Sequence, residues 1–206
     1  MENLKLDAPT IIEVVGLPGA GKSFFATQFA HTFSAAIVSF DHIRWTLFAH
    51  HTYSDNENAM VEQVADLLIT ELLKTRKTFV LDGGCNTRPE REEIAKRARK
   101  AGFQVVTVVV QVDDATAKRR ALKRSANNPG DRYKQSMTAS DFAAQEKNFQ
   151  MPVVEKTTVV ISGKHTYTTQ ARMVLKKILE IQNAPVAVRN APRPVPILHG
   201  RSPFIQ

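Results

Sequence analysis

The sequence predicts an α/β domain of three layers, in which helices cover both faces of a parallel sheet. Short apolar runs alternate along the chain with helical patterns, an alternation typical of parallel β-α-β units. Five such runs occur, and residues 104–112, the fourth, are apolar enough for a central strand buried on both faces. The 206 residues suffice for one such domain with a substantial core.

The first predicted strand leads into a glycine-rich segment. Residues 11–15 form an apolar, β-branched run, and Gly16–Ser23 (GLPGAGKS) then match the pattern G-x-x-x-x-G-K-[ST] of a phosphate-binding loop. A helix is predicted directly afterwards, because phenylalanine recurs at positions 25, 29 and 33. In such a loop, backbone amides and the helix N-terminus surround a phosphate.

The residue types of this loop predict binding of a nucleotide and Mg²⁺. Lys22 would reach the β- and γ-phosphates, and the Ser23 hydroxyl would ligate the metal. The predicted nucleotide-binding residues are Gly16, Leu17, Pro18, Gly19, Ala20, Gly21, Lys22, Ser23 and Phe24.

Acidic residues follow the second and third predicted strands. Residues 35–40 lead into Asp41, and residues 78–82 end in Asp82. Ligands of open parallel sheets bind beyond the carboxyl ends of the strands, so both acids fall where chemistry is expected. Asp82 would hold Mg²⁺ or its waters. Asp41 would either take the proton of an attacking hydroxyl or merely cap a helix. Arg44, three residues on, would either steer the acceptor or lie at the surface.

Helix signals separate the strands. The apolar residues 61, 64, 68 and 72 form one stripe, which predicts core packing, behind a capping box at Ser54–Glu57. A second box, Thr87–Glu90, opens a helix that Gly102 ends. Further helices are predicted over 140–149 and 169–182, on either side of a strand at 157–161.

A basic segment follows the fourth strand. Five of the seven residues 118–124 are Lys or Arg. Arg120 and Arg124 would project from one helix face and close over a transferred phosphoryl group, or the segment would simply be a solvated helix face. A lid is therefore predicted over about residues 113–135.

The net charge of +8 is unevenly distributed. Residues 1–111 carry 12 basic and 13 acidic side chains, whereas residues 112–206 carry 16 and 7. The basic half predicts either a nucleic-acid face or a phosphate-gripping lid with a solvated tail. Residues 184–206, with five prolines, three arginines and no acid, predict an extended or disordered tail beyond a domain of residues 1–183.

The single cysteine, Cys85, rules out an internal disulfide and favours a reducing compartment. The sequence shows neither a signal peptide nor an apolar run long enough to cross a bilayer. A cytoplasmic location without a membrane partner is therefore expected, and the oligomeric state is left open.

Taken together, four elements over about residues 10–182 resemble the P-loop kinase family. The similar branches are the polynucleotide 5′-hydroxyl kinases, the zeta toxins and uncharacterised kinases of the AAA-33 type. The four elements are the loop Gly16–Ser23, the motif Ser39-x-Asp41-x-x-Arg44, Asp82 followed by Asn86 and Arg91, and a lid with Arg120 and Arg124.

This resemblance implies a P-loop NTPase fold with five parallel strands in the order 2-3-1-4-5 and an enzyme that uses ATP and Mg²⁺. Lys22 and Ser23 would serve the nucleotide, Asp41 would be the general base, Arg44 would position the acceptor and Arg120 would stabilise the transferred phosphoryl. The acceptor is open between a nucleic-acid 5′-hydroxyl, a nucleotide sugar, as in zeta toxins, and another small metabolite. A non-catalytic, regulatory ATP-binding module is the alternative from a different class.

Overall fold

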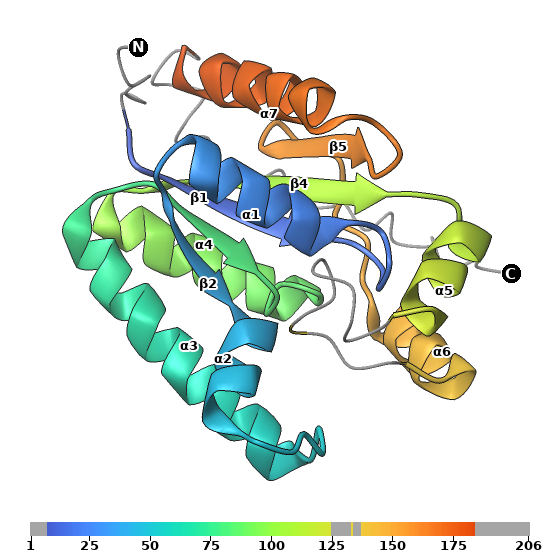
Figure 1. Ribbon diagram of the computed structural model, residues 1–206. Helices are drawn as coiled ribbons and strands as arrows, with labels where there is room; N and C mark the ends of the chain where they lie inside the picture. Colours follow the sequence, from blue (N-terminus) through green and yellow to red (C-terminus); the bar gives the residue numbers. More distant parts are fainter. Residues whose placement is uncertain (1–7, 125–132, 134–136, 184–206) are drawn as a thin grey trace, which may run out of the picture.

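The computed structural model describes residues 8–124, 133 and 137–183 (Figure 1). Its sheet has five parallel strands in the order β2-β3-β1-β4-β5, which confirms the predicted order. The predicted tail, residues 184–206, and most of the predicted lid beyond Arg124 lie outside the described residues. The strands are β1 (Thr10–Val15), β2 (Ala36–Ser39), β3 (Phe79–Asp82), β4 (Gln104–Gln111) and β5 (Thr158–Ser162).

Helices cover both faces of the sheet (Figure 1). Helices α1 (Lys22–Thr32) and α7 (Tyr167–Gln182) pack on one face, where Phe25 and Phe29 are fully buried. Helices α3 (Asp55–Thr75) and α4 (Arg88–Ala101) pack on the other, through residues such as Val61, Ile69 and Ile94. The predicted three-layer α/β architecture is thus confirmed.

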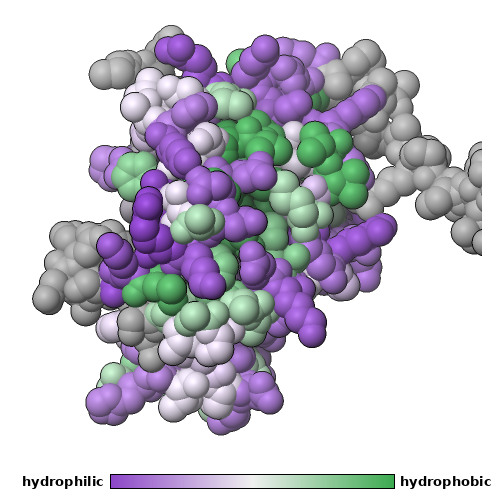
Figure 2. Space-filling view, turned by 90° about the vertical axis from the view of Figure 1, so that its right-hand side faces the viewer, coloured by the Kyte–Doolittle hydropathy of each residue, from purple (hydrophilic) through white to green (hydrophobic). Residues whose placement is uncertain are grey.

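Three shorter helices lie beyond the carboxyl ends of the strands. Helix α2 (Phe40–Leu47) follows β2 without a break, α5 (Asp114–Leu122) follows β4, and α6 (Ala139–Asn148) precedes β5. Helices α5 and α6 share a small apolar cluster of their own, formed by Ala117, Ala121 and Phe142. Figure 2 views the side of the molecule toward which the strands point, where apolar side chains gather within a hydrophilic border.

The second strand, which the apolar run of residues 35–40 predicts to be buried, is buried only in part. Of the four residues of β2, Val38 alone is fully buried, and Phe40 begins α2 rather than ending the strand. The reason is its place at the edge of the sheet, where a strand has one neighbour and one open side. An apolar run does not reveal whether its strand will lie at the centre or at the edge.

The predicted stripe on α3 is also wrong in part. Leu68 is 41% exposed, and Val64 and Leu72 are partly buried. The predicted residues and the residues that are actually buried both recur at helical spacing, so spacing does not choose between them. Contacts of α3 with α2, β2 and α4 decide which face turns inward. The residues of α3 that are buried are Glu57, Val61, Ala65 and Ile69.

Local signals placed the ends of α4 correctly. Thr87 and Glu90 form the predicted capping box, and Gly102 ends the helix with a φ of +75°.

Among the described residues, no helix has both the length and the apolar character that crossing a bilayer requires.

Candidate active site

The phosphate loop has the backbone of an anion cradle. Gly16, Gly19 and Gly21 have φ values of +145°, +80° and +105°, a region that residues with a Cβ rarely adopt. A Cβ on Gly16 would lie 2.3 Å from the carbonyl oxygen of Val110, so the loop also packs too closely on β4 for a side chain. In this fully described stretch, α1 begins at Lys22 with neither a side-chain cap nor an acid in its first turn. Its positive end is therefore suited to an anion.

Lys22 folds back over this loop. Its Nζ donates to the carbonyl oxygen of Gly16 at 2.8 Å and to that of Leu17 at 3.0 Å. The ammonium group thus lies where it would meet the phosphates of a nucleotide. The ring of Phe24 points outward and is 58% exposed, so that residue would contribute its backbone amide rather than its side chain.

Asp82 joins the phosphate loop to the second strand. The hydroxyl of Ser23 donates to its Oδ1 at 3.0 Å, and the hydroxyl of Ser39 donates to its Oδ2 at 3.2 Å. The predicted pair of Ser23 and Asp82 is therefore brought together. A hydroxyl and a carboxylate are oxygen ligands of the kind that Mg²⁺ takes, its other positions being filled by phosphates and water. Across the described part of the chain, no group of three or more His, Cys, Asp or Glu side chains could hold a metal ion by itself.

Asp41 lies in the first turn of α2, two residues beyond Ser39, and is half-buried. Ser39 caps this helix, because its Oγ accepts a hydrogen bond from the amide of His42 at 3.4 Å. The capping role considered for Asp41 is therefore filled by another residue. Asp41 follows Ser39 by two residues in the chain, and the Ser39 hydroxyl contacts Asp82.

Glycines after β3 let α2 sit close to the sheet. A Cβ on Gly84 would lie 2.2 Å from Cζ of Phe40, and one on Gly83 would lie 3.0 Å from Cβ of the same residue. Both glycines have positive φ. The ring of Phe40 therefore fits against this bare turn, and this packing sets where the neighbouring Asp41 stands.

Arg44 is buried and paired, which excludes the alternative of a surface cation and leaves its role toward the acceptor as a prediction. The side chain is 8% exposed. Its Nη1 donates to Oε1 of Glu57 at 2.6 Å, and its Nη2 donates to Oδ1 of Asn58 at 2.7 Å. Its guanidinium also lies 4.4 Å above the centre of the Tyr53 ring. Both terminal nitrogens thus hold α2 onto α3.

Glu57 is the centre of this network, and the capping box predicted at Ser54 is half formed. The hydroxyl of Ser54 accepts from the amide of Glu57 at 3.4 Å. The Glu57 carboxylate, however, accepts from Arg44 and from the amides of Thr52 and Tyr53. Burial raises the pKa of Glu57, but these hydrogen bonds outweigh it and bring the pKa down to about 2. Glu57 is therefore ionised at neutral pH and keeps Arg44 in place.

The two lid arginines do not project from one helix face, so that prediction is wrong. Helix α5 ends at Leu122, and Arg124 lies beyond it. Arg120 donates to the carbonyl oxygen of Gly163 at 3.3 Å, on the β5 side of the phosphate loop. The charge of Arg124 instead acts on Tyr53, on the α2 side. The inference from their spacing failed because the helix stops before the second arginine.

The first lid helix packs directly on the phosphate loop. A Cβ on Gly19 would lie 2.2 Å from the carbonyl oxygen of Ala117 in α5. Asp113 caps α5, and its carboxylate pairs with Nζ of Lys164 at 2.6 Å. The hydrogen bond from Lys164 is the main reason why the pKa of Asp113 is lowered. Helix α5 is thereby tied both to the loop and to the turn after β5.

The sequence analysis missed Tyr53, Asn58 and Gly163 as parts of this site. Each contacts Arg44 or Arg120 across nine residues or more of the chain, a separation for which no local spacing rule exists. A local signal existed for Glu57, the capping-box position at the start of α3, but it pointed to a different role.

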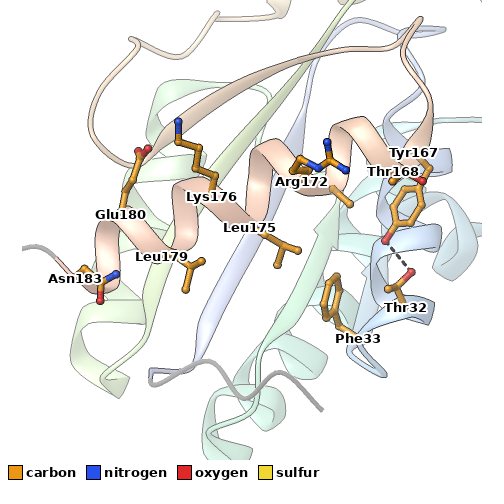
Figure 3. Close-up of a pocket in the computed structure, with 11 residues that line it drawn as sticks. Thr32, Phe33, Tyr167, Thr168, Arg172, Leu175, Lys176, Leu179, Glu180 and Asn183 are labelled. Carbon is orange, nitrogen blue, oxygen red and sulfur yellow. Dashed lines mark hydrogen bonds between the residues drawn. The ribbon is translucent and has the colours of Figure 1, made fainter. Parts of the chain in front are cut away.

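A large cavity lies away from these residues (Figure 3). It measures about 850 Å³ and runs between the end of α1 and one face of α7, lined by residues such as Phe33, Leu175 and Leu179. The hydroxyl of Tyr167 donates to Thr32 Oγ1 at 2.7 Å at one end of it. A smaller cavity of about 170 Å³ adjoins the phosphate loop. None of the predicted catalytic residues lines the large cavity.

Comparison with known proteins places this arrangement in a family. A family model described as an AAA domain, AAA_33, matches residues 11–152, from β1 to just beyond α6. A comparison with curated proteins found no match.

Solved structures share the fold at low sequence identity. A gluconokinase from Sinorhizobium meliloti 1021 aligns with a TM-score of 0.61 and 16% identity, over 84% of this chain and 94% of that one. The APS kinase CysC of Mycobacterium tuberculosis, in complex with AMPPNP and APS, aligns with a TM-score of 0.61 and 18% identity, over 84% and 98%. A chain of the Pnkp1/Rnl/Hen1 RNA repair complex aligns with a TM-score of 0.57 and 19% identity, over 72% and 46%.

Proposed function

The chain belongs to the AAA_33 family of P-loop kinase domains, and from this premise we propose that it transfers the γ-phosphoryl group of ATP to a hydroxyl acceptor. The observation that carries the proposal is the chain of contacts from Ser23 through Asp82 to Ser39. It brings Ser23 and Asp82, the candidate metal-binding residues, into contact with Ser39, which precedes Asp41 by two residues. A loop for phosphates and a carboxylate for a hydroxyl proton therefore belong to one site.

Each residue has a distinct task in this proposal. The amides of the loop and the Nζ of Lys22 bind the phosphates and hold them in line with the acceptor. Ser23 and Asp82 would hold Mg²⁺, which when bound offsets the charge of the β- and γ-phosphates. Asp41 takes the proton of the acceptor hydroxyl as that oxygen bonds to phosphorus.

The arginines divide into two kinds. Arg44, with both terminal nitrogens engaged, is a positioning residue that keeps α2 and therefore Asp41 in place. Arg124, just beyond the end of α5, would offset charge near the acceptor. Arg120, bonded to Gly163, lies beside the phosphate loop and would act from the nucleotide side.

Replacing Asp41 by Asn tests the base assignment. The change removes the proton acceptor but keeps the shape, so kcat should fall by about 10² to 10⁴, while affinity for AMPPNP stays within about twofold. Labelled-ATP transfer and equilibrium binding measure the two quantities. Asp55→Asn, an exposed acid in the first turn of α3, is the matched control. Transfer by Asp41→Asn at the wild-type rate would show that Asp41 is not the base.

Several classes of hydroxyl compound are candidates for the acceptor of the phosphoryl group. The fold is shared by a gluconokinase and by an APS kinase bound to AMPPNP and APS, so the fold by itself leaves the acceptor open. A nucleic-acid 5′-hydroxyl, a nucleotide, a nucleotide sugar and another small metabolite are the classes to compare. Labelled-ATP transfer to a panel of these compounds separates them. Binding of ATP without transfer to any of them would favour a non-catalytic, regulatory module.

The proposed cellular location rests on the single cysteine of the chain. Cys85 is the chain's one cysteine and is buried, so its side chain packs as a small apolar group. A reducing compartment, the cytoplasm, remains the proposed location.

A further inference from the structure

Tyr53 is held in an unusual backbone conformation beside Arg44 of helix α2, the helix that carries the candidate base. Its φ is +54°, in the left-handed region that residues with a Cβ rarely adopt. Glu57 accepts a hydrogen bond from the amide of Tyr53 at 3.1 Å and from that of Thr52 at 2.6 Å, and Asn58 Nδ2 donates to the Tyr53 carbonyl oxygen at 3.2 Å. Hydrogen bonds with the start of α3 therefore keep this residue where it is, a pattern that is frequent at functional sites.

One face of the Tyr53 ring is already covered. The Arg44 guanidinium lies 4.4 Å above the ring centre, and its hydrogen bonds to Glu57 and Asn58 prevent it from swinging away. The Tyr53 side chain is nevertheless 39% exposed. A ring that is held on one face by Arg44 and partly exposed to solvent is a preorganised surface for another flat group.

Charged groups of the site surround this ring. Burial raises the pKa of the Tyr53 hydroxyl, Asp41 raises it further, and Arg44 and Arg124 act in the opposite direction. The ring itself packs on Arg44, which lies on the same helix as the candidate base Asp41 and three residues after it. The hydroxyl stays protonated at neutral pH, so the ring remains a neutral stacking surface.

We infer that Tyr53 binds the acceptor, with the open face of its ring stacked on a flat ring of the acceptor whose hydroxyl is thereby held beside Asp41. The inference rests on the function proposed above and narrows the acceptor to hydroxyl compounds that carry a planar aromatic ring, such as a nucleobase. Stacking of a base on an aromatic side chain changes affinity by about five- to hundredfold. Arg44 supports this surface from behind and is not itself a contact to an acceptor phosphate.

Binding is the measurement that tests this inference. Trp45, the one tryptophan of the chain, lies next to Arg44, and its ring centre is 4.3 Å from that of His51, so its fluorescence reports on this region. The full chain, saturated with AMPPNP, is titrated with the four ribonucleosides and with ribose, the same sugar without a base. Ribose should bind at least about fivefold more weakly than the nucleosides.

Substitutions assign the difference to Tyr53. Tyr53→Leu should reduce nucleoside affinity to the level of ribose, whereas Tyr53→Phe should keep it, and AMPPNP affinity should not change. Tyr53→Asn, which tolerates the left-handed backbone, replaces Tyr53→Leu if the latter does not fold. Tyr167→Leu, a change on α7 at the distant cavity, is the matched control and should bind like the wild type.

The outcomes separate this inference from the proposed function. Equal affinity for nucleosides and ribose, or unchanged nucleoside affinity in Tyr53→Leu and Tyr53→Asn, would overturn the inference. Nucleoside binding through Tyr53 without phosphoryl transfer would sink the proposed function and leave the inference standing. Phosphoryl transfer to hydroxyl compounds without a flat ring, at a rate that the Tyr53 substitutions do not change, would overturn the inference and leave the proposed function standing.

Discussion

Two buried glutamates of this domain have pKa values shifted in opposite directions. Glu57 accepts hydrogen bonds from an arginine and two backbone amides, and its pKa is lowered to about 2. Glu13, in the centre of β1, accepts one hydrogen bond from the Thr107 hydroxyl at 3.0 Å, and its Oε1 has no partner among the described residues. Burial therefore dominates and raises the pKa of Glu13 to about 7. The number of donors decides which carboxylate stays charged.

Glu13 makes stability depend on pH. Between pH 4.5, its ordinary value, and about 7, the unfolded chain loses this proton while the folded chain keeps it. Stability therefore falls as pH rises through this window and levels off above it. The glutamine side chain of Glu13→Gln is neutral at every pH, so this variant does not lose stability over the same pH range. Its stability relative to the wild type should rise from near zero at pH 4.5 to about 3 kcal/mol at pH 8.

Urea unfolding of both proteins at several pH values measures this difference. Glu62→Gln, an exposed change on α3, controls for the loss of one acid and should show little dependence on pH. A stability difference for Glu13→Gln that is constant from pH 4.5 to 8 would contradict a carboxyl that is neutral in the folded state.

At the scale of elements, the turn after β5 supports the phosphate loop. A Cβ on Gly163 would lie 1.9 Å from the carbonyl oxygen of Ala20, and the carbonyl of Gly163 accepts the hydrogen bond from Arg120. The loop, the lid helix α5 and this turn thus meet at one glycine. We expect the position of the loop to depend on it.

Gly163→Ala should weaken nucleotide binding. Overpacking of this kind costs about 1–3 kcal/mol, and if the loop absorbs it, affinity for AMPPNP should fall by about five- to hundredfold. Gly102→Ala is the control, because that glycine ends α4 with a positive φ and its added Cβ would meet nothing closer than Arg76 Nη2 at 3.5 Å. It should lower stability to urea by about 1 kcal/mol without changing nucleotide affinity. Equal nucleotide affinity in the two variants would show that the turn after β5 does not influence nucleotide binding by the phosphate loop.

In the molecule as a whole, the end of the last described helix, α7, contacts the start of the described chain. The basic, proline-rich residues 184–206 follow this helix in the sequence. Helix α7 ends at Gln182, whose Nε2 donates to the carbonyl oxygen of Ala8 at 3.4 Å. The first and last described elements therefore meet beside β1. The boundary of the domain at residue 183 remains a prediction.

Deleting residues 184–206 tests that boundary. Because the described contacts of the site come from residues 16–163, the shortened chain should keep its kcat and its KM for ATP within about twofold. Steady-state transfer by the full and shortened chains measures this. A fall of tenfold or more would place part of the segment in the active domain, whereas loss of a binding partner at unchanged turnover would identify it as an interaction arm.

The sequence by itself determined the α/β class, the phosphate loop and the caps of α4. Each of these depends on residues within a few positions of one another, so that Gly16–Ser23 or Thr87–Glu90 carries its own geometry. The strand order came from a family resemblance and was confirmed.

Tertiary structure alone decided what the candidate site does with its charged side chains. It paired Arg44 with Glu57, thirteen residues away, ended α5 before Arg124, and turned Ala65 and Ile69 inward in place of Leu68. These outcomes depend on where one helix ends and which segment lies beside it. Contacts between distant parts of the chain settle both, and no local spacing contains that information.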